Sequence, residues 1–169
     1  MQHLWAPWRM EYILEAKDQV REGCIFCVFP REQEDRDNLI LWRGRRAFVM
    51  LNKFPYNPGH ALVVPYTHTA DLDVLAPDEL TDLMLSLRHA IGCLRRAMAP
   101  DGYNIGINLG RTAGAGIPGH VHYHVVPRWD GDQNFMPILA ETKVMPQHLW
   151  RTYDQLAPLF REQGPDMRA

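Results

Sequence analysis

Cysteine, long apolar runs and excess charge of either sign are all scarce in this 169-residue chain. It has only three cysteines, an odd number that argues against a disulfide framework and predicts a reducing, cytoplasmic setting. No apolar run approaches the ~18 residues that span a bilayer. Residues 1–9 lack the continuous apolar core of a secretory signal. The formal net charge of −2 argues against a general nucleic-acid binder. We therefore predict one globular domain over residues 1–169, with no membrane or nucleic-acid partner.

Histidine, by contrast, is concentrated in one stretch, 120–127, which reads His-Val-His-Tyr-His-Val-Val-Pro. The alternation of histidine with apolar residues predicts a β-strand. His120, His122 and His124 would then share one face, each roughly 6.5–7 Å from the next. Packing alone does not call for three imidazoles in a row. Two chemistries remain open: the middle histidine attacks phosphorus while its neighbours steady the phosphate, or all three bind a metal.

The remaining periodicity predicts an α+β fold with an antiparallel sheet. Residues 77–98 carry an apolar helical stripe, with Pro77 at the first position and Pro100 beyond the end. Cys93 in this helix is expected to be core. Residues 1–20 are expected to be an aromatic segment with a short helix, residues 30–38 a charged loop, and the tail from Gly164 frayed. Strands are expected at 39–42, 47–51, 60–65 and 103–110, and a C-terminal helix at 146–162.

Two further patterns suggest a site. Cys24 and Cys27 form a CxxC pair, which can be half of a zinc site, a redox pair or two unrelated thiols. A glycine-rich loop, residues 111–119, runs directly into the histidine stretch. Glycines allow the backbone to approach a ligand closely, and consecutive amides can bind an anion. A tight connection between two antiparallel strands would also use such a loop.

The histidine stretch resembles the His-x-His-x-His signature of the histidine triad (HIT) superfamily. Residues 57–65, Asn-Pro-Gly-His-Ala-Leu-Val-Val-Pro, resemble that family's Pro-Gly-His strand. The order of elements from about residue 24 to 129 is also similar. The opening 4–10 and the segment 134–146 most resemble the bacterial diadenosine tetraphosphate phosphorylase-like members. The resemblance implies a five-stranded antiparallel sheet with a long helix and a C-terminal helix.

The resemblance also implies a role for each matching residue. His122 would attack the α-phosphorus of a nucleotide and carry the nucleotidyl group, and His124 would hydrogen-bond the phosphate or the leaving oxygen. Asn52 falls where the family contacts the ribose hydroxyls. Phosphate oxygens would be held by Asn108 and the glycine-rich loop, through Arg111, Gly114, Ala115 and Gly116.

Some superfamily members carry a structural zinc. The resemblance selects as its ligands Cys24, Cys27, His68 and His120, a Cys₂His₂ set suited to tetrahedral zinc. His120 would then anchor the histidine stretch to the N-terminal part of the chain. The superfamily also forms two-fold dimers with a continuous sheet, so the resemblance implies a homodimer.

One departure bears on the reaction. Many family hydrolases have Ala-Gly-Gln before the triad, whereas residues 113–116 here read Ala-Gly-Ala-Gly. The missing glutamine leaves room for inorganic phosphate as acceptor. The sequence thus predicts an enzyme that transfers a nucleotidyl group from a dinucleoside polyphosphate, by phosphorolysis. The alternatives are a hydrolase of dinucleoside polyphosphates or phosphoramidates, a metal-dependent hydrolase using the three histidines, and a nucleotide-binding module with little turnover.

Overall fold

The computed structural model describes residues 23–132 and 147–162. The segments expected at 1–20 and 134–146, and the tail from residue 164, lie outside these ranges. The helices are α2 (Ile25–Glu32), α3 (Pro77–Met98) and α5 (Leu149–Glu162), with a 3-10 turn at Leu72–Val74. The strands are β1 (Ile40–Arg43), β2 (Ala47–Leu51), β3 (Ala61–Pro65), β4 (Gly102–Ile107) and β5 (Tyr123–Arg128).

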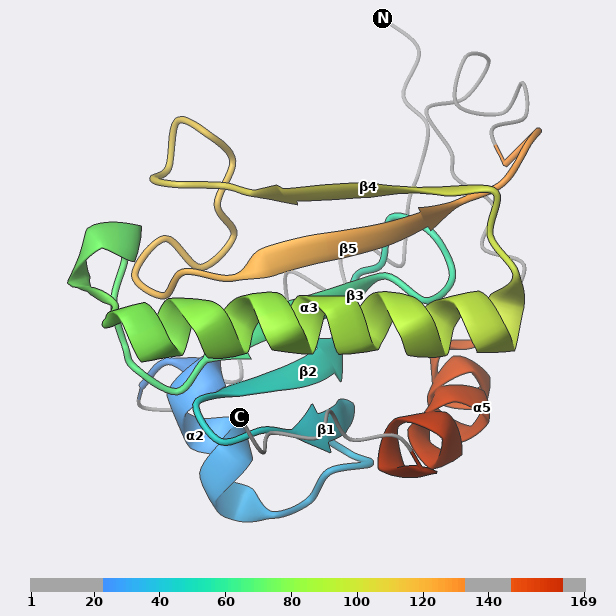
Figure 1. Cartoon of the computed structure of the whole chain (residues 1–169), viewed down its shortest axis with the longest axis horizontal. Coiled ribbons are helices and arrows are strands. Elements are labelled where there is room, and N and C mark those ends of the chain that lie inside the picture. The colour runs from blue at the N-terminus through green and yellow to red at the C-terminus, as the bar shows by residue number, and fades with distance from the viewer. Residues whose placement is uncertain (1–22, 133–146, 163–169) are drawn as a thin grey trace, which may run out of the picture.

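The five strands form one antiparallel sheet with the spatial order β1-β2-β3-β5-β4 (Figure 1). This confirms the expected α+β class and the five-stranded sheet. β5 lies between β3 and β4, where His124 pairs with Leu62 on one side and Gly106 on the other. Backbone hydrogen bonds on both edges hold β5 in place, so it is a rigid support for side chains that point off its face.

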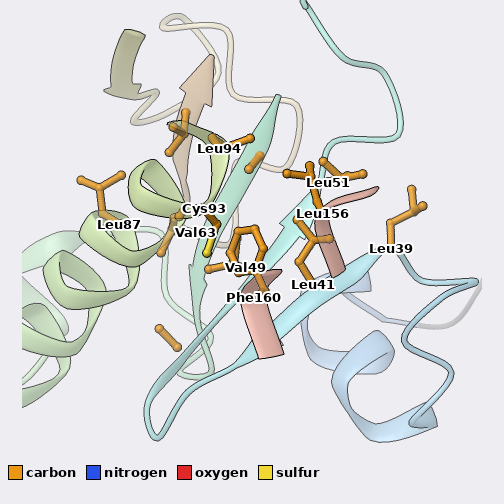
Figure 2. Packing of buried hydrophobic residues seen from close by; sticks show 14 of the residues in the cluster. Leu39, Leu41, Val49, Leu51, Val63, Leu87, Cys93, Leu94, Leu156 and Phe160 are labelled. Atoms are coloured by element: carbon orange, nitrogen blue, oxygen red, sulfur yellow. The ribbon is translucent and has the colours of Figure 1, made fainter. Parts of the chain in front are cut away.

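The two faces of the sheet are covered by different helices. Alternate side chains of each strand point to opposite faces. One face packs under α3 and α5, in a core that includes Leu41, Val49, Val63, Leu94, Leu156 and Phe160 (Figure 2). On the other face, α2 brings Phe26 against Phe48, Met50, Leu62 and Val64. Val121, Tyr123 and Val125 pack with the first core, so the intervening histidines lie on the face that α2 covers.

The helix expected at 77–98 is confirmed with the same bounds as α3. Its N-terminus is closed by Glu79, whose Oε2 accepts the Ala76 N–H at 2.9 Å. Cys93 is buried, as expected. Leu80 and Met84 belong to the same apolar stripe but are 37% and 47% exposed, because the helix touches the sheet along a narrower strip. No helix in the described ranges, α3 included, is both long and apolar enough to cross a membrane.

Three sequence-based boundaries are wrong. The strand expected at 103–110 is β4, which ends at Ile107, so residues 108–110 lie beyond it. Part of the expected charged loop at 30–38 is helical, because α2 runs through Pro30 to Glu32 and ends at Gln33 with φ 57°. The histidine stretch is also not one continuous strand. β5 begins only at Tyr123, so His120 and His122 precede the strand and His124 alone lies in it. The segment before β5 instead meets the end of β3, where the Val121 N–H donates to the Thr69 carbonyl at 2.7 Å.

Candidate active site and metal centre

A group of four metal-binding side chains is assembled from three separate parts of the fold. Cys24 caps the N-terminus of α2 and Cys27 lies in its first turn. The two histidines come from the segments after β3 and before β5. The ligand atoms all lie within 4.8 Å of one another and belong to Cys24, Cys27, His68 and His120. These are the four residues that the family resemblance selects.

The spacing of these atoms fits a tetrahedral zinc ion. Zinc bonds of about 2.3 Å to sulfur and about 2.05 Å to nitrogen place S and N ligands about 3.5 Å apart and two N ligands about 3.3 Å apart. The His120 Nδ1 lies 3.4 Å from the Cys24 Sγ and 3.6 Å from the Cys27 Sγ. The His68 Nδ1 lies 3.4 Å from the Cys27 Sγ and 3.2 Å from the His120 Nδ1. The donor set and these four distances are therefore compatible with a tetrahedral metal ion.

The far side of the His120 ring supports this role. Its Nε2–H donates to the Pro65 carbonyl at 2.9 Å, which leaves the Nδ1 lone pair facing the two thiols. Burial lowers the pKa of His120, so the ring is neutral near pH 7, as a metal ligand must be. Burial and the adjacent Cys24 thiol raise the pKa of Cys27. A bound cation would oppose that shift by favouring the thiolate.

His122 is held in one tautomer. Its side chain is 5% exposed, and its Nδ1–H donates to the His120 carbonyl at 2.8 Å. The second ring nitrogen, Nε2, therefore carries a lone pair. Burial lowers the pKa of His122, so the ring is neutral near pH 7. The Phe26 ring lies 4.9 Å away, centre to centre, and covers one side. A buried, oriented and neutral imidazole can act as a nucleophile.

His124 is the end of a chain of hydrogen bonds that begins at a backbone amide. The Tyr56 N–H donates to the His60 Nδ1 at 3.0 Å, so the His60 Nε2 carries the proton. That Nε2–H donates to the His124 Nδ1, also at 3.0 Å. The His124 Nε2–H must then point away from His60, and this buried atom has no hydrogen-bond partner in the described structure. An unpartnered buried donor beside His122 can serve a phosphate or leaving oxygen.

The surroundings keep His124 neutral. Burial, together with nearby His122, lowers its pKa to about 4. The two rings are 4.9 Å apart between centres. Near pH 7 the pair therefore offers one lone pair and one N–H donor without a positive charge. Such a pair can attack a phosphorus atom and at the same time donate to one of its oxygens.

His60 is the residue that the sequence reasoning missed. It is 1% exposed and decides which nitrogen of His124 carries the proton. Its position within the Pro-Gly-His motif was the available signal, but its contact with His124 depends on the pairing of β3 with β5. Gly59, with φ +77°, precedes it, and a Cβ there would lie 2.7 Å from the Met98 Sδ. The positive φ is what favours glycine here, because the close Met98 atom belongs to a flexible side chain that could move.

Asp132 anchors the turn that supplies the Tyr56 amide. Its Oδ2 accepts from the Asn57 Nδ2 at 2.8 Å, and the same amide group donates to the Pro127 carbonyl at 2.9 Å. Arg128 binds both carboxylate oxygens, at 2.6 and 2.9 Å. These hydrogen bonds hold the pKa of Asp132 well below its usual range. The turn before β3 is thus tied to the end of β5.

Two of the expected substrate-binding residues lie beside the histidines. Asn52 follows β2, and its Nδ2 is 3.4 Å from the His60 Nδ1. Asn108 follows β4 directly. Ile107 pairs with Tyr123, the last pair of the β4–β5 ladder, so Asn108 leaves the sheet at the same end at which the chain enters β5 from His122.

The glycine-rich loop is less ready for an anion than expected. The Gly114 N–H donates to the Arg111 carbonyl at 2.9 Å, and the Ala115 N–H donates to the Gly110 carbonyl at 3.3 Å. These two amides already have partners within the loop, so an anion would have to compete for them. Gly114 has φ +86°, a conformation that favours glycine. Within residues 23–132 and 147–162, no hydrogen bond or ion pair joins Arg111 or Gly116 to the histidines.

Comparison with known proteins places these features in context. Residues 33–131 match the HIT domain. An AP-4-A phosphorylase of Mycobacterium tuberculosis is 38% identical, over 96% of this chain and 86% of that protein. An asymmetrical bis(5'-nucleosyl)-tetraphosphatase of Schizosaccharomyces pombe is 32% identical, over 72% of this chain and 63% of that protein. A zinc-bound histidine triad family protein from Mycobacterium smegmatis superposes with a TM-score of 0.66 at 25% identity, covering 83% of this chain and 94% of that one.

Proposed function

The chain belongs to the HIT domain family, and we propose that it transfers the nucleotidyl group of a dinucleoside polyphosphate through a covalent bond to His122. One observation carries this proposal. The His122 Nε2 lone pair lies beside a buried, unpartnered N–H of His124. A nucleophile next to an oxyanion donor is what phosphoryl and nucleotidyl transfer requires. The relatives that act on diadenosine tetraphosphate and similar nucleotides support this substrate class.

In the first step, the His122 Nε2 forms a bond to the α-phosphorus and the bond from that phosphorus to the bridging oxygen breaks. With diadenosine tetraphosphate the departing half is ATP. The His124 Nε2–H donates to the charge that develops on the phosphate or on the leaving oxygen. The His122 Nδ1–H keeps its bond to the His120 carbonyl, which supports the positive charge of the substituted ring. Asn52 would bind the ribose hydroxyls, and Asn108 a phosphate oxygen.

In the second step, an acceptor oxygen attacks the phosphorus and the phosphorus–nitrogen bond breaks, which restores neutral His122. Inorganic phosphate as acceptor gives ADP, and water gives AMP. We propose phosphate. The loop lacks the glutamine of many family hydrolases, and Arg111 supplies a positive charge. The Gly116 amide would serve the anion, and the Gly114 and Ala115 amides would do so in exchange for their bonds within the loop. The 38%-identical mycobacterial phosphorylase supports the same choice.

The geometry disfavours a hydrolase that binds one metal with all three histidines. His120 faces the thiols of α2, where its Nδ1 lies 3.4 Å from the Cys24 Sγ. The Nδ1 of His122 is already bonded to a carbonyl, and the Nδ1 of His124 to His60. In the described residues, the group of side chains close enough to hold a metal includes His120 but neither His122 nor His124.

We propose that the metal is zinc and that its role is structural. Four protein ligands saturate a tetrahedral shell, so the ion would have no open position for substrate. Cys24, Cys27, His68 and His120 would hold it, and zinc would supply a rigid link between α2 and the segment that leads to His122. The zinc-bound mycobacterial relative supports the choice of metal.

We also propose a two-fold dimer built on β4. This strand is at one edge of the sheet. Its middle residues are exposed, and Ile105 is 44% exposed. An uncovered apolar edge strand favours pairing with a second copy. Light scattering of the full chain and of Ile105→Lys should give a dimer and a monomer, respectively.

Product analysis with and without phosphate tests the reaction. Diadenosine tetraphosphate plus millimolar phosphate should give ADP and ATP, with faster turnover than in buffer without phosphate. AMP as the dominant product at millimolar phosphate would show that the enzyme is a hydrolase and not a phosphorylase. If the protein binds diadenosine tetraphosphate but releases no product, it is a nucleotide-binding module with little turnover.

A further inference from the structure

Two exposed aromatic rings lie in the turn between β2 and β3, and the second of them, Tyr56, packs against the histidines. Phe54 is 48% exposed and Tyr56 is 54% exposed. The Tyr56 ring centre is 4.8 Å from that of His60 and 6.2 Å from that of His124, and the Tyr56 and His124 planes differ by only 15°. One face of Tyr56 therefore covers the imidazoles, while more than half of its surface stays in solvent. The core packing of the sheet does not need this ring.

Tyr56 and Phe26 lie at opposite ends of the group of imidazoles formed by His120, His122, His124 and His60. Phe26 contacts the rings of His120 and His122, at 5.4 and 4.9 Å. Tyr56 contacts His60 and His124 instead, so the two aromatic side chains lie at opposite ends of the row. In an in-line displacement the leaving group departs on the side of phosphorus away from the nucleophile. If His122 is the nucleophile and His124 donates to the leaving oxygen, the leaving half would extend on the side of His124 where Tyr56 lies.

We propose that Tyr56 and Phe54 form a stacking platform for the second base of a dinucleoside polyphosphate, the base of the departing half. The inference rests on the proposed function and adds a specificity determinant to it. Bases stack on aromatic rings with little dependence on base identity. Lys53, whose Nζ lies 6.0 Å from the centre of the Phe54 ring, adds a positive charge for the polyphosphate chain between the two nucleosides. The platform would make a dinucleotide a better substrate than the corresponding mononucleotide.

The test compares diadenosine tetraphosphate with adenosine tetraphosphate, which keeps the phosphate chain but lacks the second adenosine. Tyr56→Ala should lower kcat/KM for the dinucleotide by about fivefold or more, the low end of the range for loss of one base stack. Any loss on adenosine tetraphosphate, which reports the support that Tyr56 gives to His60, should be at least about fivefold smaller than the loss on the dinucleotide. Tyr56→Phe keeps the ring and should keep the wild-type ratio of kcat/KM between the two substrates. Phe54→Ala should show the same selectivity as Tyr56→Ala.

An equal loss on both substrates would overturn the platform, because Tyr56 would then only support His60. No loss on either would overturn it as well. A binding measurement separates this outcome from failure of the proposed reaction. His122→Ala protein should bind diadenosine tetraphosphate more tightly than adenosine tetraphosphate, and adding Tyr56→Ala should remove the difference. Equal binding of the two nucleotides would refute the platform even if the enzyme proved inactive on both.

Discussion

If the proposed zinc ion is bound, removing it should cost this fold a large part of its stability. The four ligands join parts of the chain that are distant in sequence, since Cys24 and His120 are 96 positions apart and His68 and His120 are 52 apart. A cross-link that closes a loop of about 100 residues contributes about 4.7 kcal/mol in the chain-entropy description of disulfides. A metal that closes long loops acts in the same way. A domain is typically stable by only about 5–15 kcal/mol, so this is a third or more of the total.

The perturbation is Cys24→Ser, which removes one ligand at the N-terminus of α2. For a chain of this size, 1 kcal/mol corresponds to about 2–4 °C in Tm, so the loss should be roughly 10–20 °C. Calorimetry should report the shift, and elemental analysis should find about one zinc per wild-type chain and far less in the variant. Cys93→Ala is the matched control, because Cys93 is buried in α3 away from the ligands. It should keep its zinc.

Two results would refute this reasoning. One is a Cys24→Ser protein that retains a full equivalent of zinc. The other is a metal-free variant whose Tm stays within about 2 °C of wild type, since that would mean that the cross-link contributes under about 1 kcal/mol. If the purified wild-type protein contains no metal and both CxxC thiols react freely with a thiol reagent, the proposed metal site does not exist.

Three further predictions concern the histidines and their anchor. His122→Ala should abolish turnover while nucleotide affinity stays within about tenfold, because the lost interaction belongs to the transition state; near-normal turnover would contradict the covalent mechanism. The pKa of His124 is about 4 in the fold against about 6.5 unfolded, so the unfolded state binds the proton more readily. The contribution of neutral His124 to the free energy of unfolding is therefore complete above about pH 6.5 and is lost as the pH falls towards 4. His124→Gln should therefore lose less Tm than wild type between pH 7 and pH 5, and parallel losses would refute this. Asp132→Asn should lower kcat about tenfold with KM and zinc unchanged, because a loosened turn misplaces the Tyr56 amide. Asp130→Asn, on the same surface turn, should leave kcat unchanged. If the two variants have the same kcat, Asp132 does not position the turn.

Sequence periodicity was sufficient for the elements with strong local signals. α3 was predicted residue for residue, because its apolar stripe, Pro77 and Pro100 agree with one another. α2 was missed, because Pro30 and the charged residues after it resemble a loop. The helix forms nevertheless, since Phe26 is buried beneath the sheet and tertiary packing outweighs local preference.

The site was predictable only in part, for a physical reason. The four residues of the candidate metal site and the histidine row could be selected by resemblance, because motif spacing preserves them. The roles of His60 and Asp132 depend on which strands pair and in what register, and no local pattern contains that information. The alternation in the histidine stretch was also misread as a continuous strand. His120 turns to the thiols of α2 before β5 begins, so a ligand and the candidate nucleophile share a short segment outside the sheet.

The central claim is that His122 carries the nucleotidyl group during turnover. The direct measurement is a rapid quench into base, where a phosphorus–nitrogen bond survives, after mixing enzyme with diadenosine tetraphosphate in the absence of phosphate. Mass spectrometry of the peptides should find one adenylyl group on the peptide that contains His122, localised to that residue, with a burst of ATP of about one per active site. The His122→Ala protein should show neither. Turnover without a burst and without an adduct, or an adduct on His124 in place of His122, would contradict the account.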